Sequence, residues 1–164
     1  MAFAVPILQK LVTRGVPAVR ALIVVPTRVL AGQIHTVMEE LIGQSMNLKS
    51  KLLTESNKKL TLTVSIGPES ERKCSDADII VTTPGRLTDF IETIEFGKLK
   101  FLIIDEADQM EGEWLNLLQP KLPNTCQKLL FSATLARDPQ FLASLKVMHD
   151  FHEKLSETGR HKIA

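Results

Sequence analysis

The sequence predicts a doubly wound α/β fold, in which a parallel sheet carries helices on both faces. Three observations predict this fold. The length of 164 residues suits one domain, short runs of Ile, Val, Leu and Phe alternate with amphipathic stretches, and the short runs show little polar alternation. Strands that are covered on both faces have this composition, because neither side of the sheet meets water. A repeated strand–helix–strand order then indicates parallel strands.

The strand candidates are short and apolar. Four of them are clear, and they lie at residues 21–25, 78–82, 101–104 and 129–131. Residues 48–53 form a weaker candidate, because lysines interrupt the apolar run. Residues 58–67 fit either an extra strand, since their apolar residues alternate, or a bent loop. Residues 69–78 are mostly polar and predict a surface segment.

Helix patterns lie between these strand candidates. In residues 30–41 apolar side chains recur at helical spacing, and Gly43 suits the position that follows a helix end. Shorter patterns cover residues 87–91 and 114–118, and a fourth covers residues 141–145. Because strands and helices alternate along the chain, we expect one layered domain without internal repeats.

The composition is that of an ordinary folded domain, with 44% hydrophobic and 24% charged residues. A net charge of +1 excludes nucleic-acid binding through bulk charge alone, but it allows a few placed contacts. No apolar run is long enough to span a membrane, and residues 1–8 lack the features of a secretory signal. Cys74 and Cys126 form no C-x-x-C pair, which favours reduced thiols in the cytosol or nucleus.

Polar segments directly follow four of the strand candidates. In an open parallel sheet, ligands bind beyond the carboxyl ends of the strands, so these segments are the first place to look for a site. We expect all of them to fall on one rim of the sheet. The four segments are residues 26–28, 83–87, 105–108 and 132–134.

The segment Asp105-Glu-Ala-Asp108 places three carboxylates within four residues at a strand end. Like charges so close together repel, and a bound cation is one usual resolution. An Asp at the end of a buried strand commonly holds Mg²⁺ through oxygen ligands or ordered water. The adjacent Glu106 could polarise a water for attack on a phosphate. The structural alternative is that these acids cap the next helix, where negative charge is favoured.

The segment Thr83-Pro-Gly-Arg86 suits the binding of an anion. Pro84 fixes its own φ, and Gly85 permits close approach to the backbone. The following helix start offers N–H groups to a phosphate oxygen, and Arg86 adds a fork of donors. The structural alternative is a plain turn that starts a helix.

Two further rim segments repeat these features. Pro26-Thr27-Arg28 combines a proline, a hydroxyl and a guanidinium at another strand end. Ser132 and Thr134 are either helix caps or turn hydroxyls, or they relay changes from the acidic segment to a moving partner domain.

In this order, the four segments resemble the DEAD-box family of ATP-dependent RNA helicases. Residues 26–33 resemble its motif Ia, residues 83–87 its motif Ib, residues 105–108 its Walker B motif and residues 132–134 its motif III. The resemblance covers about residues 1–145 and implies a RecA-like fold of the P-loop NTPase type.

The resemblance implies a role for each site residue, with ATP and Mg²⁺ as cofactors. Asp105 would hold Mg²⁺ through water, and Glu106 would orient the hydrolytic water. Asp108 would couple to Ser132 and Thr134, which links the nucleotide state to strand separation. Contacts with the RNA backbone alone predict binding that does not depend on base sequence. The residues implied to grip that backbone are Pro26, Thr27, Arg28, Thr83, Pro84, Gly85 and Arg86.

The 164 residues contain no G-x-x-x-x-G-K-[ST] phosphate loop, since the sole Gly97-Lys98 is followed by Leu99. In the family this loop directly precedes a helix that resembles residues 2–11, and a second RecA-like domain supplies arginine fingers and half of the RNA clamp. We therefore expect an incomplete RecA-like domain that is inactive by itself. We also expect that loss of the strand before the loop exposes a neighbouring strand, as an edge or as an unfilled central slot, and lowers stability.

The expected organisation is a partial ATP-binding domain over residues 1–145 and a divergent tail over residues 146–164. The tail predicts a short amphipathic helix. His149, His152 and Glu153 lie on it without a closed set of metal ligands, so a solvated helix face is favoured.

Two functions remain open at this point. The first is the amino-terminal core of an RNA helicase. The second is a truncated isoform or partial gene model that binds RNA or a partner protein without hydrolysing ATP. Other P-loop ATPases, such as ABC-type or recombinase ATPases, do not pair these segments on successive strand ends.

The expected cellular location follows from a resemblance to one branch of the family. Residues 20–33, together with Trp114-Leu115, resemble a branch of the family that is associated with large ribosomal subunit assembly in the nucleolus. We therefore expect a role in ribosome biogenesis and a place in the nucleus, with the cytoplasm as the alternative.

Overall fold

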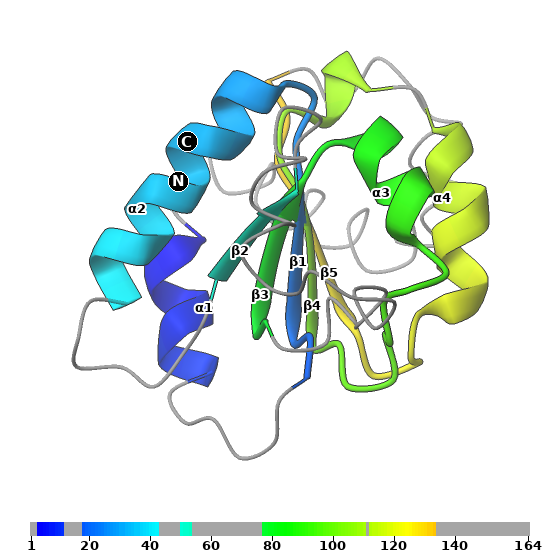
Figure 1. Ribbon diagram of the computed structural model, residues 1–164, viewed down its shortest axis with the longest axis horizontal. Helices are drawn as coiled ribbons and strands as arrows, with labels where there is room; N and C mark the ends of the chain where they lie inside the picture. The colour runs from blue at the N-terminus through cyan, green and yellow to red at the C-terminus, as the bar shows by residue number, and fades with distance from the viewer. Residues whose placement is uncertain (1–2, 12–17, 43–49, 54–76, 111, 134–164) are drawn as a thin grey trace, which may run out of the picture.

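A parallel sheet forms the centre of the molecule in the computed structural model, which describes residues 3–11, 18–42, 50–53, 77–110 and 112–133 (Figure 1). Within these residues five strands lie in the spatial order β2-β3-β1-β4-β5. Every neighbouring pair is parallel, which confirms the predicted α/β sheet. The strands are β1 (Ala21–Val24), β2 (Ser50–Leu53), β3 (Ile79–Thr82), β4 (Phe101–Ile104) and β5 (Gln127–Leu130).

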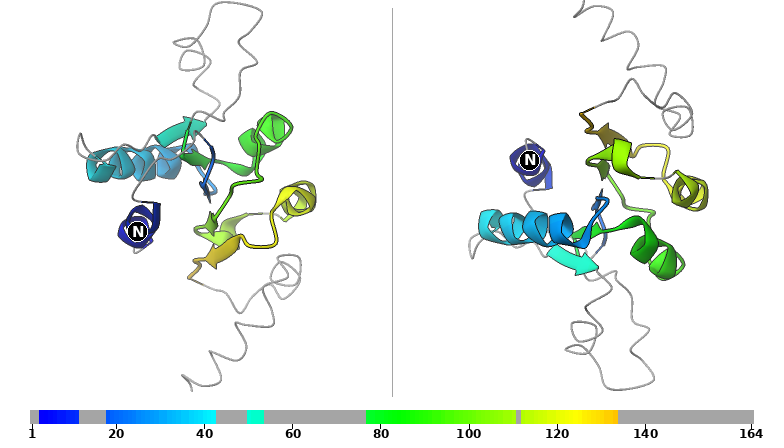
Figure 2. Two further views of the ribbon diagram at one scale, coloured as in Figure 1. Left: turned by 90° about the horizontal axis from the view of Figure 1, so that it is seen from below. Right: turned by 90° about the horizontal axis from the view of Figure 1, so that it is seen from above.

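Helices cover both faces of this sheet (Figure 2). On one face lie α1 (Ala4–Leu11) and α2 (Arg28–Ile42), and on the other lie α3 (Pro84–Phe90) and α4 (Glu113–Leu118). Two short 3₁₀ turns, η2 (Ala107–Gln109) and η3 (Gln119–Lys121), flank α4 in the chain. The fold is therefore doubly wound, as the sequence predicts.

Side chains of each central strand alternate between two cores. Ala21 and Ile23 of β1 pack under α1 and α2, whereas Leu22 and Val24 pack under α3 and α4. All four side chains are fully buried. This arrangement explains why β1 is apolar throughout, because both of its faces lie under helices.

The helix α2 follows its predicted pattern with one difference. Thr27 starts it, since the Thr27 Oγ1 accepts a hydrogen bond of 3.2 Å from the Leu30 N–H. Ala31, Ile34 and Met38 are spaced three and four residues apart, so they share the face that packs on the sheet. Leu41, which the periodicity places among the apolar positions, is 42% exposed.

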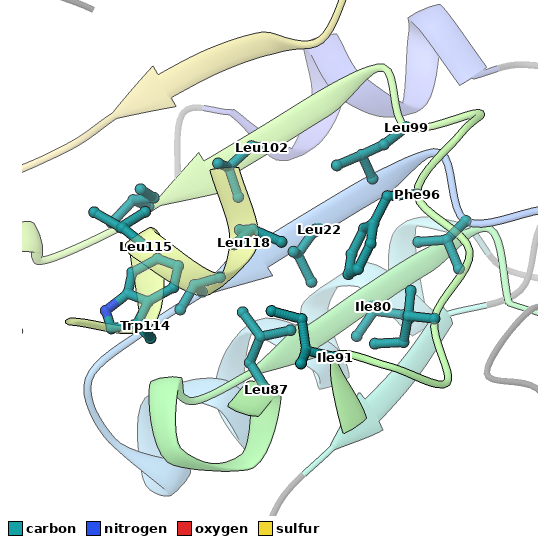
Figure 3. Packing of buried hydrophobic residues seen from close by; sticks show 14 of the residues in the cluster. Leu22, Ile80, Leu87, Ile91, Phe96, Leu99, Leu102, Trp114, Leu115 and Leu118 are labelled. Carbon is teal, nitrogen blue, oxygen red and sulfur yellow. The ribbon is translucent and has the colours of Figure 1, made fainter. Parts of the chain in front are cut away.

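The opposite core is built by α3, α4 and the segment that leads into β4 (Figure 3). Leu87 and Ile91 approach the sheet from α3 and the residue after it, and Trp114, Leu115 and Leu118 approach it from α4. All five side chains are buried. These contacts confirm the two short helix patterns that the sequence shows at residues 87–91 and 114–118.

The strands match the predicted runs closely. β5 begins at Gln127, two residues before the predicted run, because Gln127 pairs in register with Phe101 at the start of β4. Of the weak candidate at residues 48–53, the described residues 50–53 form the strand β2. Several predictions lie outside the described residues, namely those for Gly43, residues 58–67 and 141–145, the tail at residues 146–164, and nearly all of residues 69–78.

β5 forms one edge of the described sheet. Among the strands that the structure describes, it pairs with β4 alone. Its side chains Lys128, Leu129 and Leu130 are half-buried, whereas those of β1 and β3 are fully buried. The expected loss of stability at such an edge stays a prediction.

A buried ion pair joins the amino ends of the central strands. The Arg20 Nη2 lies 2.7 Å from the Asp78 Oδ1, and the Arg20 Nε donates to the same oxygen at 3.2 Å. The third nitrogen, Nη1, donates to the carbonyl oxygen of Leu11 at the end of α1. The side chain of Asp78 is fully buried, and that of Arg20 is 11% exposed. This pair therefore links the start of β1, the start of β3 and helix α1.

The thiol of Cys126 is free and half-buried, whereas Cys74 lies outside the described residues. Burial raises the pKa of the Cys126 thiol above its ordinary value and outweighs the opposing charge of Lys128. Because the thiolate is the nucleophile, Cys126 should react with iodoacetamide more slowly in the folded chain than in urea near neutral pH. Peptide mass spectrometry measures the two rates, and equal rates would contradict the burial effect.

Within the residues that the structure describes, none of the helices has both the length and the apolar character needed to cross a lipid bilayer.

Candidate functional site

The carboxyl ends of four neighbouring strands lie at one level. Val24 at the end of β1 is in register with Thr82 of β3 and with Ile104 of β4, and Ile104 is in register with Leu130 of β5. The polar segments that follow these residues therefore start side by side on one rim. Neighbouring strands are about 4.8 Å apart, so the acidic segment begins about 10 Å from the Thr83 segment.

The acidic segment is held between the two strands that flank β4. The Asp105 N–H donates to the carbonyl oxygen of Val24 at 3.1 Å, and the Ala107 N–H donates to that of Phe131 at 3.1 Å. Glu106, between them, has φ 51° and ψ 47°, and it alone among the described non-glycine residues has a positive φ. This left-handed conformation costs a non-glycine residue about 1 kcal/mol or more. Bonds on both sides of Glu106 hold the chain in that conformation.

The carboxylate of Asp105 suits a metal that keeps its water shell. Its Oδ1 accepts a hydrogen bond of 3.0 Å from the Glu106 N–H, which fixes the carboxylate and leaves Oδ2 for a further contact. Among the described residues no group of three His, Cys, Asp or Glu side chains is arranged to hold a metal ion. Mg²⁺ commonly keeps several waters and contacts only one or two carboxylates. The donor set therefore fits water-mediated binding at Asp105.

Asp108 points to the end of β5. The Ser132 Oγ–H donates to the Asp108 Oδ1 at 2.6 Å, within the range of short hydrogen bonds to charged groups. This contact joins two of the predicted coupling residues across neighbouring strand ends. The third, Thr134, lies outside the described residues.

The segment after β1 has a structural task as well as an exposed surface. Thr27 caps α2 through its oxygen, and its hydroxyl proton remains able to donate. Thr27 and Arg28 are exposed, and Pro26 is half-buried. Thr27 and Arg28, which are predicted to contact an RNA backbone, are thus accessible from the solvent.

The segment after β3 leads directly into α3. Thr83 precedes Pro84, the first residue of the helix, and the Thr83 side chain makes no capping hydrogen bond. Gly85 is exposed, and a Cβ added there would meet no protein atom within 4 Å. Packing inside the protein therefore does not require glycine at residue 85. Close approach of a ligand is a remaining reason for it.

Arg86 is restrained by two neighbours that the sequence analysis did not single out. Its Nη1 donates to the Asp89 Oδ2 at 3.2 Å, and its guanidinium carbon lies 4.2 Å from the centroid of the Phe90 ring. Spacings of three and four residues on one helix were the sequence signal for these contacts. The roles assigned to all these rim residues remain predictions.

Most of the chain matches a known protein family. A family model described as DEAD/DEAH box helicase matches residues 1–142. The ATP-dependent RNA helicase DBP6 of Candida albicans is 36% identical over 163 residues, which cover 89% of this chain and 26% of that protein. DBP6 of Saccharomyces cerevisiae strain S288c is 33% identical over 164 residues, which cover 90% of this chain and 24% of that protein.

A solved structure extends the comparison to the fold. A variant of S. cerevisiae Dbp5 bound to RNA and ADP BeF3 is similar with a TM-score of 0.65 and 26% sequence identity. The match covers 94% of this chain and 36% of that chain. The fold is therefore RecA-like, and the chain spans about a quarter of the length of the curated relatives that it matches.

Proposed function

Since the chain belongs to the DEAD/DEAH box helicase family, we propose that it supplies the RNA-gripping and metal-holding rim of an ATP-dependent RNA helicase. One observation carries this proposal, namely the common level of the ends of β3, β1, β4 and β5. An RNA backbone that contacts the first two ends would lie beside the acidic segment on the third. Nucleotide chemistry and RNA binding would then share one rigid sheet.

The acidic segment would serve the nucleotide. Asp105 would hold Mg²⁺ through water with the oxygen that the Glu106 N–H leaves open. When bound, the ion would neutralise the developing charge on the phosphates of ATP. Glu106, fixed by the bonds on either side of it, would orient the attacking water.

The bond between Ser132 and Asp108 would couple the two halves of the activity. It connects the acidic segment to the end of β5, so a movement of one segment would displace the other. Thr134 would act with Ser132 in this coupling.

The RNA contacts would be made without reading bases. The segment after β1 offers a hydroxyl and a guanidinium, and the segment after β3 offers a guanidinium and a helix start, which suit phosphate and sugar oxygens. The proposed contact residues are Pro26, Thr27, Arg28, Thr83, Pro84, Gly85 and Arg86.

A second function is favoured by the absence of a phosphate loop from the 164 residues. A chain of this sequence would bind RNA, or a partner protein, without hydrolysing ATP. Both functions use the same RNA-gripping segments, so ATP hydrolysis tells them apart.

The cellular role rests on the finer resemblance of residues 20–33 and Trp114-Leu115. We propose a part in large ribosomal subunit assembly, and hence a place in the nucleus and nucleolus. The cytoplasm is the alternative location.

A filter-binding titration tests the RNA grip. The chain of residues 1–164 should retain single-stranded RNA equally with and without ATP, and Arg86→Ala should weaken binding about tenfold or more, because it removes a phosphate donor. Poly-U and mixed-sequence RNA should respond alike. The slope of log affinity against log salt should fall by about 1.

The matched control is Lys98→Ala. Lys98 is exposed and lies just before β4, at the opposite end of the sheet from the rim. Lys98→Ala removes one positive charge, as Arg86→Ala does. An equal loss of RNA affinity in both variants would therefore contradict RNA binding at the rim.

A further inference from the structure

We propose that Asp89 and Phe90 are positioning residues that hold the Arg86 guanidinium ready for a phosphate of single-stranded RNA. The inference rests on the proposed function, and it adds two residues that themselves need not touch the RNA. Both lie on α3 with Arg86, three and four residues further along the helix.

The contacts of Arg86 fix its guanidinium on two sides. Asp89 accepts a hydrogen bond from Nη1, and the guanidinium lies over the ring of Phe90. The Arg86 side chain is 19% exposed, whereas that of Asp89 is 60% exposed. Phe90 is itself anchored, because it packs against the core under α3 and α4. A long cationic side chain at the rim is thus kept close to the protein surface.

One nitrogen of the Arg86 guanidinium is left for an anion. Within the residues that the structure describes, Nη2 makes no hydrogen bond, whereas Nη1 donates to Asp89 and Nε is buried without a hydrogen-bond partner. A guanidinium presents five N–H donors in a planar fork that suits phosphate oxygens. Asp89 therefore orients the group without consuming its capacity to bind.

Helix stability does not explain this pair. Arg86 is the third residue of α3 and Asp89 is the sixth, so the cation lies near the helix amino end and the anion near its carboxyl end. The helix dipole favours the opposite placement of both charges. A pair that works against its own helix, yet holds an arginine on an aromatic ring, is better explained by what that arginine contacts.

The two restraints would favour RNA binding because the Arg86 side chain then loses less conformational entropy when RNA binds. Arginine has many rotamers, and a free side chain must give them up when it grips a phosphate. The ion pair and the ring restrict Arg86 before RNA arrives. Removal of either restraint should therefore weaken binding about threefold to tenfold, although the contact atoms of Arg86 remain.

The sign of the Asp89 effect makes the test decisive. If Asp89 acted only as a negative charge near the RNA, Asp89→Ala would reduce repulsion and tighten binding. If it positions Arg86, the same change loosens the guanidinium and weakens binding. Loss of an acidic residue near the carboxyl end of α3 should also favour the helix slightly, so weaker binding would not reflect a lost helix.

The experiment is a filter-binding titration of single-stranded RNA with the chain of residues 1–164 and its variants. Asp89→Ala and Phe90→Leu should each weaken binding about threefold to tenfold, and Phe90→Tyr, which keeps an aromatic ring, should bind like the parent chain. In the Arg86→Ala background neither change should have a further effect. Thermal melting of each variant confirms that the fold is kept.

The control is Glu92→Ala. This nearby carboxylate pairs with Lys121 at 2.8 Å rather than with Arg86, so its removal should not weaken RNA binding. Unchanged or tighter binding by both Asp89→Ala and Phe90→Leu, with a loss for Arg86→Ala, would overturn the positioning role alone. Effects that persist in the Arg86→Ala background would overturn it as well. No loss for Arg86→Ala would overturn the RNA grip and this inference together.

Discussion

Asp78→Ala should lower the free energy of unfolding by about 3–5 kcal/mol, because it removes the carboxylate that the largely buried Arg20 guanidinium contacts with two of its nitrogens. Domains of this kind are stabilised by about 5–15 kcal/mol in total. The change would therefore remove a large share of the stability. The contacts of Arg20 with β1, β3 and the end of α1 make the effect global rather than local.

Urea denaturation measures this effect directly. Trp114 is the single tryptophan and is 5% exposed, so its fluorescence reports unfolding of the core under α3 and α4. Glu92→Ala is the control, because Glu92 is 78% exposed and its partner Lys121 is 32% exposed, and surface pairs contribute at most about 1 kcal/mol. Equal shifts of the unfolding midpoint in both variants would contradict a special role for the buried pair.

The double variant Arg20→Met with Asp78→Leu separates two explanations. If an uncompensated charge causes the loss, removal of both charges should recover most of the stability. If the hydrogen bonds to Asp78 and Leu11 are themselves essential, the double variant should be as unstable as Asp78→Ala.

A polypeptide of residues 1–164 should hydrolyse ATP no faster than background, with or without RNA. The N–H groups and the lysine of a phosphate loop supply most of the stabilisation of the β- and γ-phosphates, and no such loop occurs in the sequence. An arginine finger alone contributes about 10³ to 10⁵ in rate, and in the family it comes from the second domain. The rim itself presents three carboxylates, which repel a triphosphate until cations balance them.

A coupled phosphate-release assay at saturating RNA checks this expectation. Glu106→Gln is the control, because it removes the residue that would orient the attacking water and leaves the size of the side chain unchanged. Phosphate release in the parent chain that disappears in Glu106→Gln would contradict the prediction. Release that is equal in both chains would come from a contaminating ATPase.

The fold was predictable because its information is local. The strands β1, β3 and β4 are almost purely apolar, and helices cover both of their faces, so composition alone marks them. β5 was harder to delimit, because its first residue, Gln127, is exposed and polar. It becomes a strand through pairing with Phe101, which the sequence pattern does not contain.

The site was predictable in its residues and less so in its contacts. Position after a strand end identified the acidic segment and the Thr83 segment, because parallel strands bring their carboxyl ends to one rim. The left-handed backbone of Glu106 was not predictable, since glutamate has no preference for it and the neighbouring strands impose it. The contact of Arg86 with Asp89 had a sequence signal in the spacing of three residues, but that signal was weak because the two charges run against the helix dipole.

The pair of Arg20 and Asp78 was hidden for a different reason. The two residues are 58 positions apart, and each lies just before a strand, where charged residues are usually exposed. Only the pairing of β1 with β3 brings the strand starts together.

The bond from the Ala107 amide to the Phe131 carbonyl offers a way to watch this rim at work. Ala107 is buried, so its amide proton should exchange with deuterium slowly while the end of β5 stays in place. A movement of that strand end, whether caused by RNA or by a partner, would release the proton and quicken its exchange. A single amide thus acts as a probe of whether a signal has crossed from the last strand to the acidic segment.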